Sequence, residues 1–119
     1  MPTEPLSQKE IEDRLRELPG WSLAGDRIER RYRLGDHFAA TALVVHVAQI
    51  QQELNHHSDL TLGYDSVAVS VNTHSAGGIT DKDFALARKI EDVVLWRPKE
   101  DEALEGTPNK WVRSGDPRG

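Results

Sequence analysis

Apolar residues recur every three or four positions in three segments of the chain, the spacing that places side chains on one face of a helix. It predicts helices over about residues 8–18 and 37–55, and a third from residue 81 to about residue 96. Capping boxes that begin at Ser7 and Thr80 mark the starts of the first and third helix. The apolar stripes consist of Ile11, Leu15 and Leu18, then Ala39, Leu43, Val47, Ile50 and Leu54, then Ala87, Ile90 and Val94.

Four shorter segments alternate between apolar and polar residues, as strands with one buried face do. Each pair of segments flanks a short turn sequence, so we predict two hairpins. Arg30 is an exception to the alternation, because it shares the parity of Ile28, Tyr32 and Leu34. The predicted hairpins are residues 21–23 and 28–34 around Gly25-Asp26, and residues 60–64 and 67–73 around Asp65-Ser66.

The resulting order is α-β-β-α-β-β-α, and the short hairpins require antiparallel strands. We therefore predict an α+β two-layer sandwich, a four-stranded antiparallel sheet with three helices on one face. The domain is expected to span residues 1–97, and residues 98–119 to form a charged tail with three Pro and three Gly. Whether Trp111 and Val112 dock this tail onto the domain is left open, since chain ends stay mobile unless they are tied down.

The composition excludes several function classes. With 119 residues, 37% of them hydrophobic, the chain has enough apolar side chains for one modest core and is too short for a two-domain dehydrogenase or a TIM barrel. The net charge of −5 argues against direct binding to a nucleic-acid backbone, which needs clustered cations. Cysteine is absent, which rules out disulfides, a thiolate nucleophile and Cys-ligated zinc.

Localisation is also constrained by the sequence. The first residues lack the basic and apolar regions of a signal peptide. No apolar run approaches the roughly 20 residues of a membrane span. We expect a cytoplasmic protein without a membrane partner.

Three of the five histidines cluster around the second predicted hairpin. His56 and His57 lie where the long helix ends, and His74 lies where the Val-rich strand ends. Imidazoles exchange protons near neutral pH, so this cluster suits general acid–base catalysis if the two segments meet. The alternatives are a solvated helix end for the pair and a loop residue for His74. The other two histidines, His37 and His46, are interpreted as structural or surface residues.

A zinc site built from three histidines is the other chemical alternative. Adjacent histidines on one turn rarely point at the same ion, and the sequence has no HExxH spacing. We therefore expect neither a metal ion nor a cofactor.

Taken together, these motifs resemble the pterin-4a-carbinolamine dehydratase family. The resemblance covers about residues 6–96 and implies the same α-β-β-α-β-β-α order that the periodicity predicts. The residues that carry it are Glu53-Leu54-Asn55-His56-His57-Ser58-Asp59, Tyr64, Thr73-His74, Gly78-Ile79-Thr80 with Asp83, Leu18-Pro19-Gly20-Trp21, and Asp36 with Phe38.

The family resemblance implies a hydro-lyase that dehydrates 4a-hydroxytetrahydrobiopterin to quinonoid dihydropterin and so recycles the cofactor of pterin-dependent hydroxylases. It implies that His56 and His74 form the acid–base pair and that His57 binds and orients the pterin. Asp83 is implied as a binding or supporting residue, in competition with its role as the third residue of a capping box. It also implies a homodimer or homotetramer. The alternative is a non-catalytic protein-binding module of the same fold, a coactivator or an assembly factor.

Two positions depart from the family pattern. Ser58 stands where the family usually has proline after the histidine pair, which frees the backbone of the turn and is expected to loosen the pair. Gln52 stands where the family favours an acidic residue, and an amide forms hydrogen bonds but carries no charge. Gln52 and Thr73 are candidates for residues that position the catalytic side chains without contacting the substrate.

Overall fold

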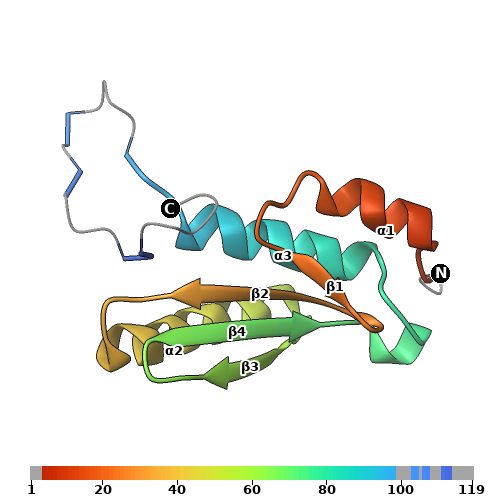
Figure 1. The fold of residues 1–119 in the computed structure, drawn as a ribbon, viewed down its shortest axis with the longest axis horizontal. Helices are drawn as coiled ribbons and strands as arrows, with labels where there is room; N and C mark the ends of the chain where they lie inside the picture. Colours follow the sequence, from red (N-terminus) through yellow and green to blue (C-terminus); the bar gives the residue numbers. More distant parts are fainter. Residues whose placement is uncertain (1–3, 99–102, 105, 108–110, 114–119) are drawn as a thin grey trace.

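The computed structural model describes residues 4–98, 103, 104, 106, 107 and 111–113. Within these residues the predicted fold class is confirmed: three α-helices lie on one face of a four-stranded antiparallel sheet (Figure 1). The elements are α1 (Gln8–Leu15), β1 (Ser22–Ala24), β2 (Arg27–Arg33), α2 (His37–Leu54), β3 (Asp59–Leu62), β4 (Ser66–Val71), the 3₁₀ helix η1 (His74–Ala76) and α3 (Asp81–Val94).

The strand order is β1-β2-β4-β3, so the two hairpins join through their long strands, β2 and β4. The pairing of Ile28 with Val71 and of Tyr32 with Val67 puts apolar side chains from both strands on one face, where they are fully buried. Figure 1 shows α2 crossing behind the sheet, and its Leu43 and Val47 are also fully buried. The core therefore lies between the sheet and the helices, as alternation at period two and period 3.6 requires.

The ends of α1 and β3 differ from the prediction, because the backbone forms a tight turn at each of them. The first helix ends at Leu15, three residues early, because the N–H groups of Glu17 and Leu18 bond carbonyls three residues back in a tighter turn. Leu18 is nevertheless buried, as its place in the stripe predicted. The third strand ends at Leu62, since Gly63 N–H donates to the Ser66 carbonyl at 2.8 Å and closes the hairpin.

Arg30, the exception in the strand pattern, is part of a buried charged cluster. Its Nε donates to Glu91 Oε1 at 2.7 Å, and both side chains are almost completely buried. The same oxygen accepts hydrogen bonds from Trp21 Nε1 at 3.0 Å and from the Tyr32 hydroxyl at 2.5 Å. Gly20 (φ +93°) makes room for the guanidinium, because a Cβ there would lie 2.6 Å from Arg30 Cζ. The arginine faces the core because a carboxylate on α3 meets it there.

Residues 111–113 of the C-terminal tail dock onto the domain at the end of β2. Val112 forms an antiparallel bridge with Leu34, and both side chains are fully buried. Arg113 N–H donates to the Arg33 carbonyl at 2.9 Å, and the Trp111 ring lies 5.8 Å from the His46 ring. Of the two alternatives left open for this segment, docking is the one observed.

Replacing Val112 with Ala should lower the free energy of unfolding by about 1–2 kcal/mol, through two lost buried methyl groups and the cavity they leave. Val45→Ala is the matched control, because Val45 on α2 is 66% exposed. It should change stability by less than about 0.5 kcal/mol. Urea denaturation followed by circular dichroism measures both, and equal effects of the two variants would show that the tail contributes no packing.

Candidate active site

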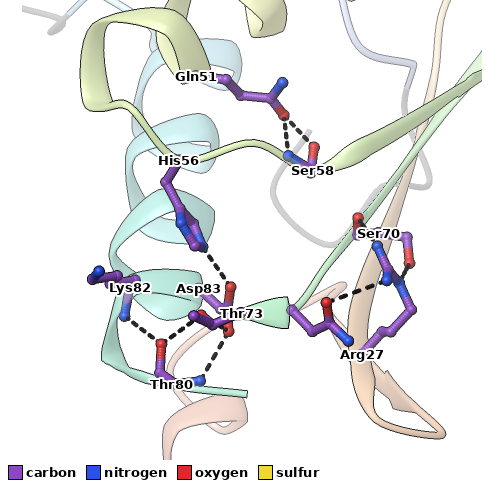
Figure 2. A network of polar contacts seen from close by, with 10 residues as sticks. Arg27, Gln51, His56, Ser58, Ser70, Thr73, Thr80, Lys82 and Asp83 are labelled. Carbon is purple, nitrogen blue, oxygen red and sulfur yellow. Dashed lines mark hydrogen bonds and ion pairs between the residues drawn. The ribbon is translucent and has the colours of Figure 1, made fainter. Parts of the chain in front are cut away.

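Asp83, near the start of α3, is a completely buried carboxylate that joins two distant segments of the chain (Figure 2). Its Oδ1 lies 2.7 Å from His56 Nε2. Its Oδ2 accepts hydrogen bonds from Thr73 Oγ1 at 2.9 Å and from Thr80 N–H at 2.8 Å. Asp83 therefore closes the predicted capping box with one oxygen and holds an imidazole with the other.

The local backbone explains why His56 reaches α3. Asn55 caps the end of helix α2 and adopts a left-handed conformation (φ 52°, ψ 41°). Asparagine tolerates this conformation better than most residues. The next residue, His56, donates its N–H to the Gln51 carbonyl at 3.2 Å, so the chain folds back over the helix end. The His56 side chain remains 17% exposed and thus has one side toward solvent.

Thr73 lies just beyond the end of β4, held in place by the short loop that follows. It forms an antiparallel bridge with Gly78, and Gly77 between them adopts φ +78°, which favours glycine. The Thr73 hydroxyl donates its proton to Asp83. In the 2.7 Å contact between the two hydroxyls, Thr80 is therefore the donor and Thr73 the acceptor. A chain of hydroxyl donors thus ends on the carboxylate, which fixes its orientation toward His56.

The structure supports the hypothesis that the two histidine segments meet. His56 and Thr73 bond to the same carboxylate, and the next residues along the chain are His57 and His74. Both are exposed, and neither side chain forms a hydrogen bond or ion pair within the part of the chain that the structure describes. Nor does any group of three His, Cys, Asp or Glu side chains in that part have the arrangement of a metal site.

The turn after the histidine pair is fixed despite the absence of proline. Ser58 donates both its N–H, at 3.1 Å, and its hydroxyl to Gln51 Oε1 (Figure 2). Gln51 is 4% exposed, whereas Gln52 faces solvent. The expected loosening of the pair is therefore opposed by a contact that proline, without an N–H, cannot make. Gln51 makes this contact, and not the neighbouring Gln52 named in the sequence analysis, because one step along the helix turns the side-chain direction by about 100°.

Arg27 fixes the strand that leaves this turn. Its Nη2 donates to Asp59 Oδ2 at 2.8 Å, and its Nε donates to Ser70 Oγ at 2.7 Å. Arg27 lies just before the strand predicted over residues 28–34. No sequence spacing indicates the contact, because it depends on the register that places Asp59 opposite Ser70.

A hollow of about 320 Å³ opens beside His56, within the size range of small-molecule sites. Leu54 and Leu86 contribute apolar parts of its lining, and Asn55 and Lys82 contribute polar parts. Leu54, predicted for the core stripe of its helix, is 46% exposed here because the helix ends at this residue. The side chains can accept a small molecule that has both an apolar face and polar edges.

The fold and the site define a small α+β domain in which a buried carboxylate holds an imidazole beside an open hollow. The model of the family described as pterin 4 alpha carbinolamine dehydratase matches residues 4–93, and the chain belongs to this family. No helix in the described residues has the length and apolarity needed to cross a membrane.

Individual relatives agree with the family match. A Streptomyces avermitilis protein, provisionally named pterin-4-alpha-carbinolamine dehydratase, is 72% identical over 94 residues, which are 78% of this chain and 93% of that protein. A Chloroflexus aurantiacus protein with the same provisional name is 43% identical over 89 residues, 75% of this chain and 96% of that one.

Solved structures show the same fold. The crystal structure of a transcriptional coactivator/pterin dehydratase from Brucella melitensis superposes with a TM-score of 0.71 at 29% identity, covering 76% of this chain and 98% of that one. A pterin dehydratase-like protein identified as a RuBisCO assembly factor of the alpha-carboxysome has a TM-score of 0.50 at 15% identity, covering 61% of this chain and 84% of that one. The second likeness concerns the fold alone.

Proposed function

We propose that the chain is a hydro-lyase that dehydrates 4a-hydroxytetrahydropterins, with 4a-hydroxytetrahydrobiopterin as the expected substrate. The observation that carries the proposal is the 2.7 Å contact between His56 Nε2 and the buried Asp83 carboxylate, beside a hollow of about 320 Å³ in a chain of this family. A module that only binds proteins has no need for a buried carboxylate that orients an imidazole.

The reaction removes water from a carbinolamine. The hydroxyl at C4a leaves with one proton, the N5–H bond gives up its proton, and a C4a=N5 double bond forms. One group must therefore donate a proton and another must accept one, which positioned imidazoles do near neutral pH. We assign these two tasks to His56 and His74, and the orientation of the pterin ring to His57.

Asp83 acts in this proposal as a positioning residue. A carboxylate accepts hydrogen bonds, so His56 presents its Nε2–H to Asp83 and leaves Nδ1 for the substrate. Thr73 and Thr80 hold the carboxylate from the far side. The imidazole thus keeps one tautomer and one orientation before the substrate arrives, which lowers the cost of reaching the transition state.

A stopped-flow assay of synthetic 4a-hydroxytetrahydrobiopterin tests the proposed activity. The wild-type chain at micromolar concentration is expected to accelerate quinonoid dihydropterin formation at least tenfold over buffer, with initial rates proportional to protein concentration. Bovine serum albumin at equal concentration controls for nonspecific catalysis by surface histidines. A rate equal to that in buffer would favour the alternative, a protein-binding module that has kept the fold.

We also propose that the protein forms homodimers or homotetramers in the cytoplasm. The sheet ends in two short edge strands, β1 and β3, and unpaired strand edges favour pairing between copies of a chain.

A further inference from the structure

A second hollow, of about 360 Å³, lies at the opposite end of α3 from Asp83. Val93 lines it and lies ten positions after Asp83 on the helix, about 15 Å along the axis. Trp96, Arg97 and Trp111 form other parts of its wall. It is therefore separate from the candidate active site.

This hollow is a feature of the segment that follows the family domain. The family model ends at residue 93, and every lining residue except Val93 comes after that point. Docking of Val112 against Leu34 brings Trp111 back to the end of α3 and so completes the wall. The match to the family therefore does not explain this pocket.

Two side chains of the pocket are in energetically costly environments. Trp96 is 65% exposed, which leaves a large aromatic surface in contact with water. Arg97 Nη1 donates to the Trp96 carbonyl at 2.8 Å, but Nη2 is buried and has no hydrogen-bond partner among the residues that the structure describes. A buried donor without an acceptor is rare in native structures and costs free energy, more so on a charged group.

One chemical class of ligand relieves both costs. A planar aromatic ring covers the indole surfaces, and a carboxylate accepts a hydrogen bond from the free donor of Arg97. We propose that this pocket binds a small aromatic carboxylate. The ring of the ligand would pack against Trp96, Trp111 and Pro98. Its carboxylate would bind Arg97. The volume suits a ligand with a single ring and a short acidic side chain.

Indole N–H signals in a ¹H–¹⁵N NMR titration with 3-phenylpropionate test the proposal on the full chain. The three Trp residues give three signals, and Trp96→Phe and Trp111→Phe assign two of them. Saturable shifts are expected for Trp96 and Trp111, with a dissociation constant of about 0.1–1 mM for a ligand of this size. Trp21 should not move, because its indole is buried against Glu91.

Matched variants separate the charge contact from simple apolar binding. Arg97→Gln should weaken 3-phenylpropionate binding about tenfold or more, and leave binding of the neutral 3-phenylpropan-1-ol unchanged. Arg88→Gln, a substitution of an exposed arginine on α3, should leave both affinities unchanged. The proposal is overturned by the absence of saturable shifts up to 10 mM ligand, by equal shifts of all three indoles, or by an Arg97→Gln affinity equal to that of the wild type. None of these outcomes depends on the proposed dehydratase activity.

Discussion

Replacing His56 with Ala is expected to lower the rate constant of pterin dehydration by about 10²- to 10⁴-fold, the usual contribution of a positioned acid or base. The expectation rests on the geometry of the ring, because a buried carboxylate holds one nitrogen. The proposed mechanism uses the other nitrogen. Stopped-flow measurement under single-turnover conditions gives the rate constant of the chemical step. His37→Ala is the control, because that histidine begins α2 and bonds the carbonyls of the β3–β4 turn instead.

Asp83→Asn tests the positioning role separately. The variant keeps the size of the side chain, but an amide nitrogen facing His56 favours the other tautomer, so a fall of at least about tenfold in the rate constant is expected. Substrate binding should change little, because Asp83 is completely buried and is proposed to act only through His56.

For the first of these two variants, a wild-type rate constant in His56→Ala would show that the imidazole takes no part in the reaction.

Removal of the Glu91 carboxylate is expected to have the largest effect on stability. Glu91→Ala leaves the buried Arg30 guanidinium without its carboxylate and removes the acceptor of Trp21 Nε1 and the Tyr32 hydroxyl. Loss of one partner of a buried ion pair costs about 3–5 kcal/mol, a large share of the stability of a small domain. The free energy of unfolding from urea titration measures the loss.

Asp92→Ala provides the control for this substitution, since Asp92 is the exposed neighbour of Glu91 on α3. Surface substitutions of this kind change stability by less than about 0.5 kcal/mol. If Glu91→Ala unfolds at the same urea concentration as Asp92→Ala, the cluster does not stabilise the fold.

The periodicity of apolar residues predicts the fold well, because burial of one face of each helix and strand decides the elements and their order. Polar residues in the core are less predictable. Arg30 interrupts its strand pattern, and only the packing of α3 against the sheet reveals Glu91 as its partner. Asp83 is found by motif, but its two simultaneous contacts, one with the cap and one with His56, require the folded arrangement.

The turn after the histidine pair shows the same limit. The sequence identifies Ser58 and Gln52 as departures from the family pattern, and the structure shows that Ser58 bonds to Gln51 instead. Adjacent positions on a helix point in directions about 100° apart, so only the packing of α2 decides which glutamine faces the turn. The tail is a further case, because the sequence singles out Trp111 and Val112 but only the folded structure shows that Val112 packs beside Leu34.

The most direct test of the central claim compares the wild type with the double variant His56→Ala, His74→Ala in the dehydration assay. Circular dichroism and urea titration of both proteins establish that the variant is folded. We expect a clear acceleration by the wild type that falls to the buffer rate in the folded double variant. Wild-type acceleration that survives in the double variant, or no acceleration by the wild type, would contradict it.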